Sequence, residues 1–207
     1  MYNTFVSPVY DISDISAELQ AATIEELRLI FAADSRKKTK DQISKSLRRL
    51  RREFPQHRLS QDIFVRVFRS PASRDAGLPP ADTAHLKQLR LKPMRSLSGI
   101  QSVAVLTKPF PCPGQCIFCP NDVRMPKSYI ASEPGAQRAE RNSFDPYLQT
   151  YNRLLALYNM GHEPSKIELI VLGGTWSDYP EAYQIWFIKE CFRALNDFGA
   201  QRDDRPR

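Results

Sequence analysis

Ser102-Val-Ala-Val-Leu-Thr107 is the stretch that decides the fold class of this 207-residue chain. It is a short apolar run, rich in β-branched residues, of the kind that is buried in a parallel sheet. A second such run, Ile167-Glu-Leu-Ile-Val-Leu172, ends at a glycine pair. Helices are expected after the two runs, over residues 145–160 and 180–198. Two successive strand–helix units predict an α/β fold with parallel pairing and right-handed crossovers.

The number of expected strands is small. Two strands can neither close a barrel nor shield both faces of a sheet. We therefore expect the chain to be the front part of a larger protein, with only the first strand–helix units of a barrel. Because such a sheet has open edges, self-association is a further expectation.

The residues before the first strand follow a different pattern. Apolar residues recur at helical spacing over residues 13–33 and again over 39–54, and each segment predicts an amphipathic helix. Residues 69–82, which are rich in Pro, Ser and Asp, are typical of a loop. We expect a basic helical region over residues 1–92 and an α/β domain over residues 93–207.

The net charge of +7 comes from the first half of the chain. Residues 1–100 hold 18 Lys and Arg against 11 Asp and Glu, whereas residues 101–207 hold 12 of each. Between Ser35 and Arg66 there are 11 basic residues and three acidic ones. A charge run is usually a solvated helix face. This one falls on helices that have separate apolar stripes, so it favours a surface that tracks RNA phosphates.

The RNA-binding candidates are the nine cations at the start and along the length of the second expected helix. They are Arg36, Lys37, Lys38, Lys40, Lys45, Arg48, Arg49, Arg51 and Arg52. Cations of this kind set the affinity for a phosphate backbone but do not determine which base is read.

Composition excludes several classes of protein. The chain is 42% hydrophobic and 26% charged, which is typical of a globular protein. No apolar run approaches the roughly 18 residues that span a bilayer, and the N-terminus lacks the pattern of a secretory signal. Four cysteines are too few for a disulfide scaffold, and three of them lie within eight positions. The prediction is a cytoplasmic protein without a membrane partner, which holds a metal site in a reducing compartment.

The cysteine cluster, Cys112-Pro-Gly-Gln-Cys116-Ile-Phe-Cys119, has the spacing C-x3-C-x2-C directly after the first expected strand. Three thiolates on a tight loop can hold three irons of a [4Fe–4S] cluster and leave the fourth iron open. An open iron can bind S-adenosylmethionine, and one electron then cleaves the sulfonium to give a 5′-deoxyadenosyl radical.

Two other interpretations of the cysteines remain open. A structural zinc site would need a fourth ligand, and the nearest histidine, His162, lies 43 residues beyond Cys119. Buried thiols without a metal fit poorly with Pro and Gly on a polar loop. The spacing favours iron–sulfur chemistry. Cys191, on the apolar face of the last expected helix, is interpreted as a core residue.

A series of short motifs surrounds the cysteines between about Leu91 and Phe198. In chain order they are Leu91-Lys-Pro-Met-Arg-Ser-Leu-Ser-Gly-Ile100, Val103-Ala-Val-Leu-Thr-Lys-Pro109, Lys127-Ser-Tyr129, Glu133-Pro134, Arg138-Ala139, Phe144-Asp-Pro-Tyr-Leu-Gln149, Gly161-His162, Lys166-Ile-Glu168 and Gly173-Gly-Thr175. Together they resemble the catalytic subunit family of Elongator, which are radical S-adenosylmethionine acetyltransferases that modify the wobble uridine of transfer RNA. The basic helices resemble, less specifically, the tRNA-binding region of that family.

The resemblance implies a truncated radical-SAM domain with a partial TIM-type barrel, and it assigns roles to residues. The three clustered cysteines would hold the [4Fe–4S] cluster. Gly173 and Gly174 would approach the methionine moiety of S-adenosylmethionine, and Lys166 would contact acetyl-coenzyme A. Many family members carry Gly-Gly after Cys-Pro, whereas Asn121-Asp122 stands here, so the local cofactor contacts are expected to differ from those of such members. The rest of the barrel and the C-terminal acetyltransferase domain of the family are expected to be absent.

The implied reaction is a radical acetyl transfer that forms carboxymethyluridine. The deoxyadenosyl radical would take hydrogen from the methyl group of acetyl-coenzyme A, and the carbon radical would add to carbon five of the wobble uridine. Thioester hydrolysis would then leave a carboxymethyl group, and a reductant protein would supply the electron. Two other functions remain open: a radical enzyme acting on another RNA, such as a methylthiotransferase, and a non-catalytic, zinc-stabilised RNA-binding module.

Overall fold

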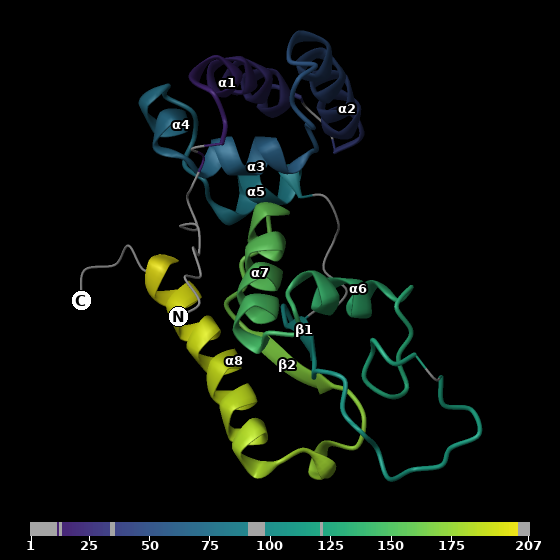
Figure 1. Ribbon diagram of the computed structural model, residues 1–207. Coiled ribbons are helices and arrows are strands. Elements are labelled where there is room, and N and C mark those ends of the chain that lie inside the picture. The colour runs from purple at the N-terminus through teal and green to yellow at the C-terminus, as the bar shows by residue number, and fades with distance from the viewer. Residues whose placement is uncertain (1–11, 13, 34–35, 91–97, 121, 203–207) are drawn as a thin grey trace. The chain divides into compact units, whose positions relative to one another are not determined.

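The computed structural model describes residues 12, 14–33, 36–90, 98–120 and 122–202 (Figure 1). In chain order the elements are α1 (Ala17–Phe31), α2 (Arg36–Glu53), α3 (Asp62–Arg69), α4 (Pro71–Asp75), α5 (Thr83–Leu89), β1 (Gln101–Leu106), α6 (Pro134–Arg141), α7 (Pro146–Asn159), β2 (Ile167–Leu172), the 3-10 helix η1 (Trp176–Asp178) and α8 (Glu181–Arg202). The described residues form two compact units. The first holds the residues up to 90 together with 156–163, and the second holds 98–155 and 164–202.

The first unit is helical and has one apolar core. Its first helix, α1, begins at the N-cap Ser16, whose hydroxyl accepts a hydrogen bond from Leu19 N at 3.3 Å. The side chains of Leu27 and Ile30 are completely buried. Helix α3 is apolar around most of its circumference and buries Ile63, Phe64, Val65, Val67 and Phe68. Each such side chain contributes about 1.5–3 kcal/mol of burial free energy.

Two of the sequence predictions for this unit are confirmed and one is wrong in part. The helices expected over residues 13–33 and 39–54 are α1 and α2. The loop expected over residues 69–82 is wrong between Pro71 and Asp75, where the chain forms α4. Ser70 is extended and Pro71 follows it at the first helical position, where proline is favourable because its missing N–H needs no partner.

The second unit contains a parallel pair of strands. β1 pairs with β2 so that Gln101 lies opposite Ile167 and Leu106 lies opposite Leu172. The predicted parallel pairing is therefore confirmed, with β1 displaced by one residue from its expected bounds. Val103 and Val105 are completely buried, as the β-branched pattern predicts. The described strands thus form a small α/β arrangement whose sheet has two strands.

Gln149 of α7 closes part of the outer edge of β1. Its side-chain amide accepts from Leu106 N at 3.0 Å and donates to Leu106 O at 2.9 Å. Both backbone groups of Leu106 are therefore paired although β2 lies on the other side of β1. The contact fixes α7 against the carboxyl end of β1, where the cysteine loop begins.

The expected helices over residues 145–160 and 180–198 are confirmed as α7 and α8. Helix α6 was not expected from the sequence. It packs Ala136 and Ala139 in a small core with Leu106 and Met125. Between β1 and α6 the chain runs through a long loop that extends away from the sheet in Figure 1. This loop carries the clustered cysteines.

Candidate cysteine site and basic helix

The cysteine loop follows the carboxyl end of β1, and the turn at residues 173–175 follows the carboxyl end of β2. Because the strands are parallel, both segments leave the same edge of the sheet, which is where α/β folds bind ligands. Cys112 and Cys119 are partly buried, whereas Cys116 is exposed. At the tip of the loop, Phe118 is 93% exposed. Residues 116–118 thus lie open to solvent.

Cys112 has two hydrogen-bond partners. Its Sγ lies 3.3 Å from Thr175 Oγ1, and the Gly114 N–H donates to the same sulfur at 3.4 Å. These hydrogen bonds, first of all the one from Thr175, lower the pKa of Cys112 below its usual value. Since the thiolate is the form that binds metal ions, they favour the ligand state of this side chain.

Gly114 leaves a small space between two of the sulfurs. A Cβ at this position would lie 3.5 Å from Cys112 Sγ and 3.6 Å from Cys116 Sγ. Cys119 Sγ instead contacts the carbonyl oxygen of Pro120 at 3.7 Å. Within the described part of the chain, no group of three His, Cys, Asp or Glu side chains is placed to hold a metal ion. The structure thus brings two of the three predicted ligands together, and their thiol chemistry fits an iron–sulfur cluster.

Gly173 is required by local packing. A Cβ at this position would come within 3.1 Å of Thr107 Cβ and would overlap the Thr107 hydroxyl. Thr107 is 1% exposed and its Oγ1 lies 2.7 Å from Tyr179 Oη, so its side chain has little room to move. A Cβ at Gly174 would meet Lys127 Cβ at an ordinary 3.5 Å. The two glycines, which were predicted together as S-adenosylmethionine contacts, therefore face different packing constraints.

Lys166 lies at the other end of β2. Its backbone carbonyl accepts from Gln101 N at 2.9 Å, and its side chain is exposed. β2 has six residues, so Lys166 and Gly173 are seven residues apart and, at roughly 3.3 Å per residue, lie about 23 Å from one another. The structure therefore brings Gly173 and Cys112 to the carboxyl ends of the strands, whereas Lys166 lies at the amino end of β2.

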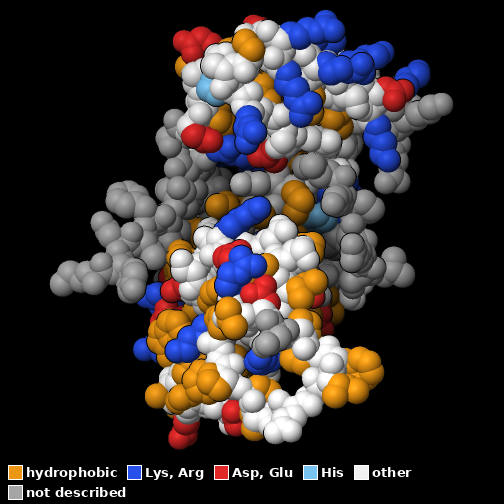
Figure 2. All heavy atoms as spheres, turned by 45° about the vertical axis from the view of Figure 1, so that its right-hand side comes forward, with side chains coloured by type: hydrophobic (Ala, Val, Ile, Leu, Met, Phe, Trp, Pro, Cys, Tyr) orange, Lys and Arg blue, Asp and Glu red, His pale blue; other side chains and the backbone are white. Residues whose placement is uncertain are grey.

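The basic candidates lie on α2, and Lys and Arg side chains gather over the N-terminal helices in Figure 2. The side chains of Arg36 and Lys37 lie outside the described residues. The other seven candidates are all exposed, namely Lys38, Lys40, Lys45, Arg48, Arg49, Arg51 and Arg52.

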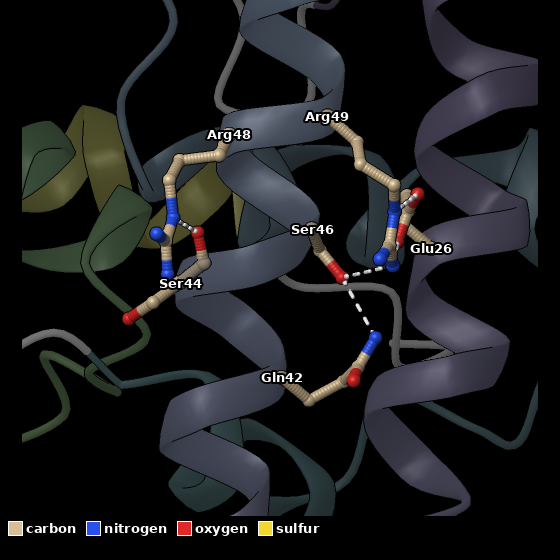
Figure 3. A network of polar contacts seen from close by, with 6 residues as sticks. All are labelled: Glu26, Gln42, Ser44, Ser46, Arg48 and Arg49. Atoms are coloured by element: carbon tan, nitrogen blue, oxygen red, sulfur yellow. Dashed lines mark hydrogen bonds and ion pairs between the residues drawn. The ribbon is translucent and has the colours of Figure 1, made fainter.

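Hydrogen bonds divide these cations into two groups. Arg49 points toward α1, where its Nε donates to Glu26 Oε1 at 2.6 Å (Figure 3). This ion pair raises the pKa of Arg49 and lowers the pKa of Glu26. Arg51 donates to the carbonyl oxygen of Leu59 at 2.7 and 3.0 Å. Both guanidinium groups thus hydrogen-bond to other residues of the first unit.

Arg48 points away from α1. Arg48 projects from the opposite side of α2 in Figure 3, and its Nε donates to Ser44 O within the helix at 3.2 Å. Lys45, Arg48 and Arg52 follow the spacing i, i+3, i+7, so they share one face of α2. We call these three residues the α2 stripe.

Sequence reasoning missed the residues that support the cysteine loop. Thr175 contacts Cys112, while the hydroxyls of Tyr179 and Tyr183 contact the chain just after β1. A signal was present for Thr175, because it directly follows the predicted glycine pair. The tyrosines are more than 70 residues from their partners in sequence, and no local pattern indicates such contacts.

Comparison with known proteins gives a consistent result. The chain is 48% identical over 118 residues to the tRNA uridine(34) acetyltransferase of Methanocaldococcus jannaschii, covering 54% of this chain and 22% of that protein. It is 45% identical over 102 residues to the protein of the same name from Dehalococcoides mccartyi, covering 49% and 22%. It is 39% identical over 133 residues to Elongator complex protein 3 of Homo sapiens, covering 58% and 24%. No protein-family model matches the chain.

This chain matches part of the Elongator catalytic subunit. The predicted resemblance is therefore confirmed for about half of the chain. The chain spans 22% of the length of its tRNA uridine(34) acetyltransferase relatives. No helix in the described ranges is long and apolar enough to cross a membrane. The cluster ligands, the cofactor contacts and the RNA-binding residues stay predictions.

Proposed function

We propose that this chain is the cluster-binding and tRNA-binding part of a radical S-adenosylmethionine enzyme that forms carboxymethyluridine at the wobble position. The enzyme would transfer a group derived from acetyl-coenzyme A to carbon five of the uridine. One observation carries the proposal: the C-x3-C-x2-C loop leaves the carboxyl end of β1 in a chain whose relatives are named tRNA uridine(34) acetyltransferase. In this proposal β1, β2 and their helices are the first units of an incomplete radical-SAM barrel.

Cys112, Cys116 and Cys119 would hold a [4Fe–4S] cluster, which when bound supplies the electron that cleaves S-adenosylmethionine. The space that Gly114 leaves beside two sulfurs supports this assignment. Thr175 donates to Cys112 Sγ once the thiol has lost its proton, and the lowered pKa of Cys112 favours that state. Because Cys116 is exposed, a reductant protein can approach the loop from solvent.

The proposed contacts to the two small molecules lie at opposite ends of β2. Gly173 and Gly174 would approach the methionine moiety of S-adenosylmethionine, and their place beside Thr175 supports this because Thr175 touches Cys112. Lys166 would contact acetyl-coenzyme A. Since Lys166 lies at the other end of β2, its contact would be with a part of that ligand far from the reacting methyl group.

The α2 stripe would contact tRNA phosphates, together with Arg36, Lys37, Lys38 and Lys40. The exposure of the stripe supports this role, as does the position of Arg48 on the side of α2 opposite the Glu26–Arg49 ion pair in Figure 3. Arg49 and Arg51 would contribute mainly by holding the first unit together. A cytoplasmic location, where tRNA is modified, belongs to the same proposal. So does self-association through the edges that the two described strands leave unpaired with another strand.

Metal analysis of the anaerobically reconstituted chain tests the proposal. We expect about four irons per chain, which Cys112→Ala, Cys116→Ala and Cys119→Ala each lose. Cys191→Ala is the matched control and should keep the iron, because Cys191 is completely buried on α8. Stoichiometric zinc without iron would contradict the proposal and favour the zinc-stabilised RNA-binding module. If the chain binds iron, nucleoside analysis of tRNA modified by the enzyme would separate carboxymethylation from methylthiolation.

A further inference from the structure

Two tyrosines, Tyr179 just before α8 and Tyr183 in its first turn, hold the backbone of Lys108, the second residue after β1. Tyr179 Oη donates to Lys108 O at 2.9 Å, and Tyr183 Oη accepts from Lys108 N at 3.0 Å. The N–H and the carbonyl of one residue are thus both paired with side chains, at the point where the strand ladder has ended. We call Tyr179 and Tyr183 the tyrosine clamp.

Aromatic stacking holds the two rings of the clamp in place. The two tyrosine rings stack on one another with their centroids 5.1 Å apart, and Phe110 stacks on Tyr179 at 4.8 Å. Tyr179 is 3% exposed, and its hydroxyl also meets Thr107 Oγ1 at 2.7 Å. Burial raises the pKa of both phenols, that of Tyr183 to about 12, so the hydroxyls keep their protons at neutral pH.

The rigidity extends from the clamp to the first cysteine. Only Pro109, Phe110 and Pro111 separate Lys108 from Cys112, and each proline ring fixes its own φ angle. Phe110 between them is held by its stacking on Tyr179. At the end of this short segment, Cys112 Sγ meets Thr175 Oγ1 at 3.3 Å. Cys112 is therefore held from the backbone side by the clamp and at the sulfur by Thr175.

Cys116 and Cys119 are joined by a backbone hydrogen bond, in which the Cys119 N–H donates to Cys116 O at 3.1 Å, but among the described residues no side chain bonds either of their sulfurs. Cys116 is exposed, and the next residues, Ile117 and Phe118, are 89% and 93% exposed. Cys119 Sγ contacts the carbonyl oxygen of the adjacent Pro120. The loop thus combines a thiol whose sulfur is bonded by a side chain with an exposed thiol, Cys116, and a partly buried one, Cys119.

We propose that Tyr179 and Tyr183 are positioning residues that hold Cys112, with its sulfur oriented by Thr175, as the first thiol to bind incoming iron. The exposed Cys116 and the partly buried Cys119 then close around the metal. Preorganisation of one ligand removes part of the ordering cost of metal binding. This inference rests on the proposed iron–sulfur function.

Hydrogen exchange in the metal-free chain tests the clamp itself. Tyr183→Phe keeps the ring but removes the acceptor of the Lys108 amide, so we expect that amide to exchange roughly five-fold faster or more. The Thr107 amide is the internal reference, because it donates to Leu172 O at 2.9 Å and not to Tyr183. Tyr147→Phe is the matched control, because it removes a tyrosine hydroxyl that bonds Asp197 on α8 and not Lys108. It should leave the exchange rate of the Lys108 amide unchanged. Equal exchange of Lys108 in the wild type and Tyr183→Phe would overturn the clamp.

Anaerobic titration with ferrous iron tests the consequence. We expect the Tyr179→Phe/Tyr183→Phe variant to bind iron about ten-fold more weakly than the wild type, and Tyr147→Phe to bind it equally well. Thr175→Val should also weaken binding and lower the midpoint potential of the reconstituted cluster, because the hydroxyl stabilises added negative charge at sulfur. Thr175→Ser, which keeps the hydroxyl, should restore both. If Thr175→Ser binds iron as weakly as Thr175→Val, the hydroxyl is not what holds Cys112, and the role of Thr175 is overturned.

The two possible failures can be told apart. A wild-type chain that binds no iron contradicts the proposed function and the inference that rests on it, whatever the exchange data show. A wild-type chain that binds iron while the double tyrosine variant binds it equally well overturns the clamp and leaves the proposed function intact.

Discussion

The α2 stripe allows a quantitative test of RNA binding. Replacing Lys45, Arg48 and Arg52 with alanine removes three cations from one exposed face of α2 and leaves the Glu26–Arg49 ion pair in place. Each phosphate contact contributes about 0.7–0.9 to the slope of log affinity against log salt. Loss of three contacts should therefore reduce the slope by about 2 to 2.7. Between about 50 and 200 mM salt, the affinity advantage of the wild type should shrink roughly twenty- to forty-fold.

Fluorescence anisotropy with labelled tRNA over a salt series measures both quantities. The matched control is Lys87→Ala/Arg141→Ala/Lys189→Ala, which removes the same net charge at exposed positions outside α2. We expect this control to keep nearly the wild-type slope. An unchanged slope in the α2 variant would refute phosphate binding by the stripe. Equal reductions in both variants would show that net charge alone drives the binding.

Two further predictions concern stability. Gly173→Ala should lower the free energy of unfolding by about 1–3 kcal/mol, because the new Cβ overlaps Thr107, whereas Gly174→Ala should change it little. Urea denaturation measures both, and equal effects would contradict the packing argument. Arg49 lowers the pKa of Glu26, so this pair stabilises the fold above the usual Glu pKa and loses its effect as pH falls through the lowered value. The stability difference between the wild type and Arg49→Ala should therefore shrink below about pH 4.

The sheet could be predicted from the sequence because a buried parallel strand leaves a strong local pattern. The runs at 102–107 and 167–172 are continuous, apolar and β-branched, and they became β1 and β2. Helix α6 left a weaker pattern, since its eight residues bury only Ala136 and Ala139. Its formation depends on packing against Leu106, which local sequence does not reveal. Helix α4 was missed for a similar reason, because its Pro and Ser residues also suit a loop.

The site shows the same division between local and tertiary information. The cysteine spacing is local, so the loop could be singled out from the sequence, while its iron–sulfur chemistry stays a prediction. The support of Cys112 by Thr175 and the tyrosine clamp depends on contacts across more than 60 residues. On α2 the nine cations look equivalent in the sequence. Only the fold places Glu26 of α1 beside Arg49 and so separates that cation from the α2 stripe.

The most direct test of the central claim is the electron paramagnetic resonance spectrum of the reduced, reconstituted chain before and after addition of S-adenosylmethionine. Three cysteine ligands leave one iron of a [4Fe–4S] cluster open, so the cofactor should bind that iron and change the spectrum. Cys191→Ala should respond as the wild type does. A cluster whose spectrum is the same with and without S-adenosylmethionine would contradict the radical function that is proposed for this chain.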